Sequence, residues 1–122
     1  MVPLGELGPY VQDALDLIEF ANGAATSKWG KVRADMGHPE PFGLKMIAIG
    51  NEQWGEVYPE RLEVFTKAIR AEYPDMQIVG SSGPSADGGQ VRLPLARNET
   101  HRGDLVDEHY YMAPDWFFAN AA

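Results

Sequence analysis

Two patterns of apolar residues take turns along this chain and predict helices that alternate with strands. Residues 9–22 carry apolar side chains at the i, i+3, i+4, i+7 spacing of an amphipathic helix. A second helix is predicted for residues 59–73, which begin with one proline and are followed by another. The apolar runs at residues 46–49 and 76–80 are typical of short strands that are buried on both faces.

The remaining segments complete an alternating order of elements. Residues 105–111 predict a third strand, and a further helix is expected to start at Pro114. The connections at 24–43, which contains Trp29, and at 83–103 are predicted as long loops, and we interpret the first as functional. This order indicates an α/β fold with parallel strands and right-handed crossovers. Three strands cannot close a barrel and leave two open edges.

A polar pair, Asn51-Glu52, follows directly after the first strand. Parallel α/β barrels place their chemistry at the carboxyl ends of the strands, and a carboxylate there is costly unless something pairs with it or uses it. Trp54 adds an aromatic surface, and amide, carboxylate and aromatic groups are combined in sugar-binding sites. The alternative is that Glu52 merely begins a solvated loop.

The third strand carries a second group of polar side chains. Its period-two alternation places Asp107, His109 and Tyr111 on one face. If that face looks into a barrel, His109 and Tyr111 lie level with Glu52 and are able to hydrogen-bond a carboxylate or a sugar hydroxyl. The alternative is a hydrogen-bonded core histidine beside packing aromatics.

The composition narrows the classes of partner. The chain has 122 residues, a formal net charge of −8 and no cysteine. An acidic balance argues against a nucleic acid or an anionic membrane as partner, because both require a basic surface. Without cysteine there is no disulfide and no thiolate metal site. The three histidines lack i, i+3 or i, i+4 spacing among themselves, so a histidine-based metal site is not predicted.

The sequence also bears on membranes and targeting. No run approaches the ~20 apolar residues that are needed to cross a bilayer. Residues 1–6 lack the basic and apolar regions of a secretory signal. The localisation stays open, and a cytoplasmic protein is expected if Met1 is the genuine start.

Several segments together resemble the family 51 glycoside hydrolases, the α-L-arabinofuranosidases. These segments are Leu15–Gly23, Ser27–Gly30 with Arg33, Gly37–Phe42, Ile49–Gly55 and Asp107–Tyr111. The resemblance implies a partial (β/α)8 barrel (a TIM barrel) in which this chain supplies about strands four to six with their flanking helices. It further implies that residues 1–122 are a fragment of a single catalytic domain. By the same resemblance, the nucleophile strand and an accessory β-sandwich domain are expected to be absent from this chain.

The resemblance also implies roles for individual residues. Glu52 matches the general acid/base, and Asn51 matches the amide that holds the 2-hydroxyl of the sugar. His109 and Tyr111 match active-site residues, and Trp54 is expected to line the substrate cleft. The implied partner is an arabinose-containing oligosaccharide or polysaccharide, and a homo-oligomer is a further expectation. No metal or cofactor is implied.

The expected function is that of a retaining hydrolase. The parent protein is predicted to remove terminal α-L-arabinofuranosyl residues, while the isolated chain is predicted to be inactive because it lacks the nucleophile. One alternative is a non-catalytic carbohydrate-binding or structural fragment. Another is a different retaining glycosidase of the same clan, such as a xylanase or endoglucanase, because those enzymes share Asn-Glu after a strand.

Overall fold

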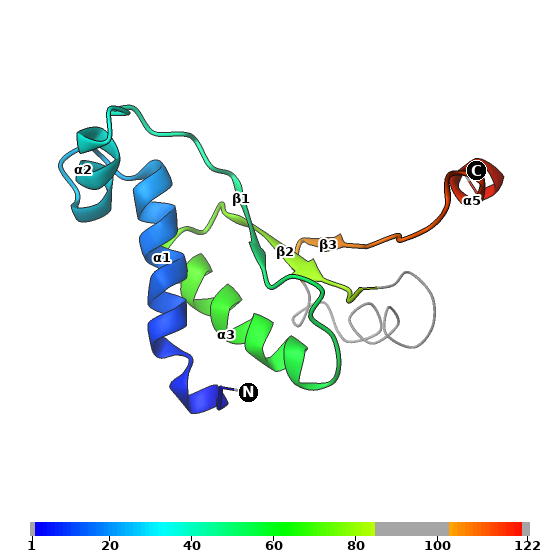
Figure 1. Cartoon of the computed structure of the whole chain (residues 1–122). Coiled ribbons are helices and arrows are strands. Elements are labelled where there is room, and N and C mark those ends of the chain that lie inside the picture. Colours follow the sequence, from blue (N-terminus) through cyan, green and yellow to red (C-terminus); the bar gives the residue numbers. More distant parts are fainter. Residues whose placement is uncertain (1, 85–102, 121–122) are drawn as a thin grey trace.

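A parallel sheet forms the centre of the computed structural model, which describes residues 2–84 and 103–120 (Figure 1). Its strands lie in the order β1 (Met46–Ile49), β2 (Gln77–Ser81) and β3 (Leu105–Asp107). Ile47 pairs with Ile78, and Gly80 pairs with Val106, with all strands running in the same direction. The predicted α/β class with parallel strands is therefore confirmed.

The described helices precede β1, lie between β1 and β2, or follow β3. They are the 3-10 turn η1 (Leu4–Glu6) and the α-helices α1 (Gly8–Asn22), α2 (Lys28–Asp35), α3 (Val57–Glu72) and α5 (Pro114–Asn120). Prolines 9 and 59 lie in the first turns of α1 and α3, where a missing N–H costs no intrahelical hydrogen bond. The two long helices and the start of α5 thus agree with the prediction. α5 lies at the end of the extended segment that follows β3, apart from α1 and α3 (Figure 1).

The core lies between the sheet and the helices α1 and α3, which lie side by side (Figure 1). Ile18 of α1, Ile69 of α3 and Ile78 of β2 are fully excluded from solvent. Ile47 and Ile49 are buried against the same helices, as the alternation along β1 predicts. Burial of side chains of this size stabilises the fold by ~1.5–3 kcal/mol each.

The opposite face of the sheet differs from the prediction. Met46 is 47% exposed, and Leu105 on β3 is 45% exposed. Ala48 is exposed as well. The prediction that β1 is buried on both faces is therefore wrong for the described residues, because both long helices pack on the side of Ile47 and Ile49.

The segment 24–43 is not one long loop, as predicted, but contains the helix α2. The Ser27 hydroxyl oxygen accepts a hydrogen bond from the backbone N–H of Gly30 at 3.2 Å and caps the start of this helix. The sequence pattern missed α2 because the helix has no apolar stripe. Its buried residues are Gly30 and Arg33.

Arg33 is fully buried and binds only backbone oxygens among the described residues. Its Nη1 donates to the carbonyl of Phe20 at 2.7 Å, and Nη2 donates to Gly23 at 2.8 Å and Pro39 at 2.9 Å. Its Nε donates to His38 at 3.0 Å. Phe20 and Gly23 lie at the end of α1, where carbonyls lack intrahelical partners and the helix dipole is negative. Arg33 therefore ties the end of α1 to the segment that follows α2.

The third strand is shorter than predicted. It ends at Asp107, whereas the prediction extends it to residue 111. The ladder stops there because Asp107 pairs with Ser81, the last residue of β2. In the predicted connection 83–103, residues 85–102, including its two adjacent glycines, lie outside the described residues.

Candidate active site around Glu52

Glu52 lies in a tight turn directly after β1. Its φ of 53° is left-handed, a conformation that costs a non-glycine residue about 1–2 kcal/mol. Gly50 also has a positive φ, 91°. The next backbone N–H, that of Gln53, donates to the hydroxyl of Ser81 at 2.9 Å. The end of β2 therefore holds the turn that carries the carboxylate.

The side chain of Glu52 meets two residues from the segment around β3. Its Oε1 accepts a hydrogen bond from the hydroxyl of Tyr111 and lies 2.9 Å from Nδ1 of His109. The other ring nitrogen of His109, Nε2, lies 2.9 Å from Oδ2 of Asp107. Within the described residues no hydrogen bond reaches Oε2 of Glu52. The structure thus brings together Glu52, His109 and Tyr111, the three residues that were expected to lie level with one another.

Charge and hydrogen bonding set the ionisation of this group, which we call the Glu52 cluster (Glu52, Asp107, His109 and Tyr111). The hydrogen bond from Tyr111, followed by that from His109, lowers the pKa of the Glu52 carboxyl. The contacts with Asp107 first, and then with Glu52, raise the pKa of His109. The side chains of Glu52 and His109 are 29% and 20% exposed, so solvent screens part of these effects.

Asn51 and Trp54 do not join the hydrogen bonds of the Glu52 cluster. The Asn51 side chain is exposed and bonds to no other side chain within the described residues. Trp54 is 53% exposed and packs against the backbone of Gly83, where an added Cβ would lie 3.1 Å from the Trp54 Cβ. Trp54 shares one open pocket with Glu52, Gln53, Gly55 and Val57. The indole therefore forms part of the surface next to the carboxylate.

Two serines at the end of β2 were not singled out from the sequence. The hydroxyl of Ser82 donates to the carbonyl of Asp107 at 2.8 Å, and its backbone N–H reaches the same oxygen at 3.2 Å. Ser81, as described, supports the turn at Glu52. Together they join the ends of all three strands. The available signal was a pair of small polar residues placed directly after an apolar strand.

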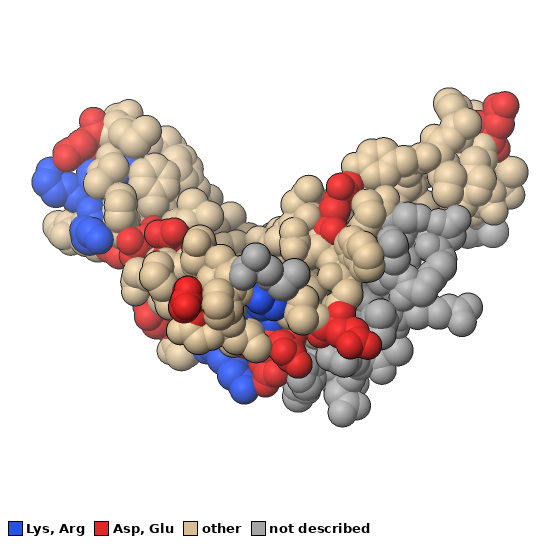
Figure 2. All heavy atoms as spheres, turned by 60° about the horizontal axis from the view of Figure 1, so that its bottom comes forward, with Lys and Arg blue, Asp and Glu red and all other residues tan. Residues whose placement is uncertain are grey.

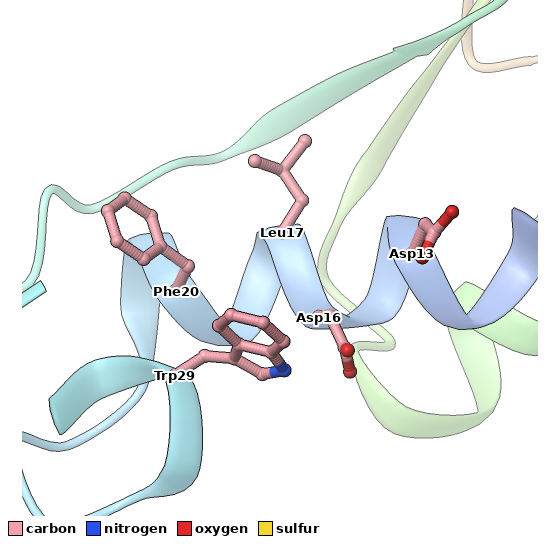
Figure 3. A pocket seen from close by; sticks show the side chains of 5 residues that line it. All are labelled: Asp13, Asp16, Leu17, Phe20 and Trp29. Carbon is pink, nitrogen blue, oxygen red and sulfur yellow. The ribbon is translucent and has the colours of Figure 1, made fainter. Parts of the chain in front are cut away.

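A second pocket lies elsewhere, on α1 and α2 (Figure 3). It is lined by Asp13, Asp16, Leu17, Phe20 and Trp29. The indole of Trp29 lies along α1 in this view, and its backbone N–H donates to the carboxylate of Glu19 at 3.2 Å. Trp29 therefore belongs to the contact between α1 and α2 and does not line the pocket at Glu52.

The described residues hold no group of three or more histidine, aspartate or glutamate side chains arranged to bind a metal ion. None of their helices is both long and apolar enough to cross a membrane. On the face shown in Figure 2, acidic side chains are scattered over the described surface, and lysines and arginines stand among them.

A family model described as the alpha-L-arabinofuranosidase 1 domain matches residues 1–122. The chain belongs to this family. The extracellular exo-alpha-L-arabinofuranosidase of Streptomyces chartreusis is 50% identical over 112 residues, which are 91% of this chain and 14% of that protein. Alpha-L-arabinofuranosidase 1 of Arabidopsis thaliana is 42% identical over 119 residues, which are 97% of this chain and 16% of that protein.

A solved structure supports the same assignment. The arabinose-bound MgGH51 α-L-arabinofuranosidase superposes with a TM-score of 0.74 at 30% sequence identity, over 98% of this chain and 18% of that chain. The resemblance to family 51 α-L-arabinofuranosidases is thereby confirmed. This member of the family spans only 14–18% of the length of these relatives.

Proposed function

We propose that this chain is the central part of the catalytic (β/α)8 barrel of an α-L-arabinofuranosidase, with β1, β2 and β3 as its fourth, fifth and sixth strands. Residues 1–122 then belong to a single catalytic domain, whose nucleophile strand and accessory β-sandwich lie in the rest of the polypeptide. Family membership and the parallel order β1-β2-β3 support this proposal. The exposed sheet face at Met46 and Leu105 fits further strands around a barrel interior.

The proposed reaction is retaining hydrolysis of terminal α-L-arabinofuranosyl residues in arabinose-containing oligosaccharides and polysaccharides. Glu52 is the general acid and then the general base. The observation that carries this role is the difference between its two carboxyl oxygens. Two side chains contact Oε1, and no described residue bonds to Oε2. Oε2 is therefore available to give a proton to the glycosidic oxygen and later to take one from water.

The neighbouring residues take positions around the sugar in this proposal. Asn51 holds the 2-hydroxyl, and Trp54 lines the cleft beside Glu52. His109 and Tyr111 orient the acid/base through Oε1. A retaining glycosidase also needs a nucleophilic carboxylate about 5–5.5 Å from the first one. We assign this nucleophile to a residue outside the chain.

The acid role requires Glu52 to be protonated near neutral pH. In the described residues its pKa is instead lowered, by Tyr111 first and His109 second. A second carboxylate nearby and exclusion of water by the substrate both raise a carboxyl pKa. Both of these contributions come from outside the chain. The proposal therefore expects the Glu52 pKa to be higher in the complete enzyme than in this segment.

The test uses the full-length protein that contains this chain, with Glu52→Gln. We expect kcat on arabinosides with poor leaving groups to fall about 10²–10⁴-fold. On substrates with an activated aryl leaving group, the rate of the first step should fall far less. Added azide should restore turnover of these substrates, because azide attacks without the help of a general base. Glu60→Gln, an exposed change in the first turn of α3, is the matched control and keeps wild-type rates.

Other outcomes would redirect the assignment. Undiminished activity of Glu52→Gln on poor leaving groups would remove Glu52 from the acid/base role. Faster hydrolysis of xylosides than of arabinosides would place the full-length protein with xylanase-like or endoglucanase-like enzymes. A full-length protein without any hydrolase activity would indicate a carbohydrate-binding or structural role. The 122-residue chain alone is expected to hydrolyse an aryl arabinofuranoside no faster than background.

A further inference from the structure

The imidazole of His109 lies between two carboxylates. Nδ1 lies 2.9 Å from Oε1 of Glu52, and Nε2 lies 2.9 Å from Oδ2 of Asp107. A neutral imidazole has one N–H donor and one acceptor nitrogen, whereas an imidazolium has two donors. Because an ionised carboxylate only accepts, both contacts are hydrogen bonds when His109 is protonated on both nitrogens.

The same contacts persist when Glu52 gains a proton. If that proton sits on Oε2, Oε1 remains an acceptor for Nδ1 of His109 and for the hydroxyl of Tyr111. A doubly protonated His109 therefore suits both ionisation states of Glu52. An unpaired imidazolium would oppose protonation of Glu52 through its charge. The carboxylate of Asp107 balances that charge across the ring.

We infer that Asp107 is a positioning residue, which keeps His109 a donor at both ring nitrogens so that Oε1 of Glu52 stays anchored while Oε2 exchanges the proton. The kinetic part of this inference rests on the proposed role of Glu52. The carboxylate of Asp107 contacts the His109 ring and not Glu52, so its proposed effect on Glu52 passes through His109.

The backbone of Asp107 is held by residues at the end of β2. It is the last residue of β3 and pairs with Ser81 of β2. Its carbonyl accepts two hydrogen bonds from Ser82, one from the hydroxyl and one from the backbone N–H. Its side chain is 45% exposed, so solvent reaches part of the carboxylate. Because its backbone is held in place, Asp107 is able to fix the orientation of the His109 ring through Nε2.

Asp107 is not a second catalytic carboxylate of a retaining pair in this arrangement. The whole imidazole ring separates its Oδ2 from Oε1 of Glu52, and retaining pairs lie about 5–5.5 Å apart with no side chain between them. Its neighbour Glu108 has a different partner, since Oε2 of Glu108 accepts from the hydroxyl of Tyr110 at 2.6 Å. Glu108 therefore provides a matched control one residue away.

The test measures the pKa of each histidine in the full-length protein from the pH dependence of C2–H exchange, read by mass spectrometry. The titratable groups that face His109 in the described residues are Glu52, Asp107 and Tyr111. In Asp107→Asn we expect the pKa of His109 to fall by about one unit or more, because the neutral amide no longer stabilises the imidazolium. Asp107→Glu retains most of the wild-type value, and Glu108→Gln leaves it unchanged.

The kinetic readout then links this pKa to the reaction. We expect Asp107→Asn to lower kcat about 10–100-fold while KM changes little, as for a lost partner behind a functional histidine. Asp107→Glu restores most of kcat. Glu108→Gln keeps wild-type kinetics.

Specific results would overturn the inference. One such result is a His109 pKa that is unchanged in Asp107→Asn. Another is a fall of the His109 pKa in Glu108→Gln that equals the fall in Asp107→Asn, which would indicate a general electrostatic effect of removing a negative charge. If Asp107→Asn does not fold, the wild-type titration decides, because an ordinary or depressed His109 pKa contradicts the inference. The exchange measurement does not depend on hydrolysis. A shifted His109 pKa together with a fully active Glu52→Gln would therefore refute the proposed function and not the placement of Asp107.

Discussion

Arg33 and His109 are two basic side chains with opposite kinds of hydrogen-bond partner. Arg33 is fully buried, and its acceptors are four backbone carbonyls. His109 is partly exposed, and its ring nitrogens face two side-chain carboxylates. Backbone carbonyls do not titrate, so the contacts of Arg33 are the same at every physiological pH. Carboxyl groups are titratable, so the contacts of His109 depend on pH, which fits the acid/base role proposed for Glu52.

The largest loss of stability is expected at Arg33. Arg33→Met removes a fully buried guanidinium and leaves four carbonyls without this donor, and we expect the free energy of unfolding to fall by about 3–5 kcal/mol. Lys31→Met removes a cation from the same helix, but the Lys31–Asp35 pair is 65% and 64% exposed, so it should cost only ~0.5 kcal/mol. Denaturant unfolding of both variants measures the difference. Equal losses would show that Arg33 does not hold α1 to α2.

An intermediate effect is expected at Tyr58, which joins the sheet to α3 beneath the Glu52 turn. Its hydroxyl donates to the carbonyl of Ile49 at 2.6 Å and accepts from the backbone N–H of Ser81 at 2.7 Å. Burial is the main cause that raises the pKa of Tyr58, so the phenol stays protonated and able to donate. Tyr58→Phe should lower the free energy of unfolding by about 1–3 kcal/mol, because both backbone groups lose their partner.

Tyr73→Phe is the control for that change. Tyr73 packs against the same core, and its hydroxyl has no hydrogen-bond partner in the described part of the chain. Denaturant midpoints should therefore shift for Tyr58→Phe and stay within error for Tyr73→Phe. Similar shifts in both variants would mean that packing, and not the bridge between β1 and β2, determines the loss.

The smallest expected effect is a pH dependence of stability that comes from Glu52 and His109. The raised pKa of His109 gives stability that is present at lower pH and is lost as pH rises through the folded-state value. The lowered pKa of Glu52 gives stability that is lost as pH falls through its folded-state value. The pair is therefore most stabilising between these two values. In His109→Gln, unfolding measured against pH should vary less over this window.

Arg33→Met sharpens the same measurement. Its loss of stability should be similar at each pH within that window, because the backbone carbonyls that it leaves do not titrate. If the loss of stability in Arg33→Met varied with pH as strongly as that in His109→Gln, the contacts of Arg33 would not be independent of pH, and the contrast with His109 would be wrong.

Predictions from the sequence succeeded where the spacing of apolar residues within one segment determines the structure of that segment. The spacing of apolar residues found α1 and α3, and the run 46–49 found β1 with Ile47 and Ile49 facing the helices. The same reasoning failed at α2, since that helix is stabilised by its capping serine and by the hydrogen bonds of Arg33 to distant carbonyls. The third strand was overestimated because β2, its only described partner, ends at Ser81.

The site shows the same division. Glu52, His109 and Tyr111 were found from their places after or along apolar strands, and the resemblance supplied their roles, which stay predictions. Asp107 was placed on the correct face, but alternation alone gave no reason to single it out. The part played by Ser81 and Ser82 depends on hydrogen bonds to the ends of the neighbouring strands, which no spacing within one segment reports.

By itself, the sequence determined the class of fold, the parallel order of elements and the family, and it pointed to the candidate site residues, whose roles stay predictions. These follow from local periodicity and from motifs that stand close together in the chain. Only the tertiary structure decided that Oε1 of Glu52 is held from residues 57 and 59 positions away, and that Asp107 lies behind the imidazole. The physical reason is that a hydrogen bond is set by distance and direction in space, and parallel strands bring together residues that the chain keeps far apart.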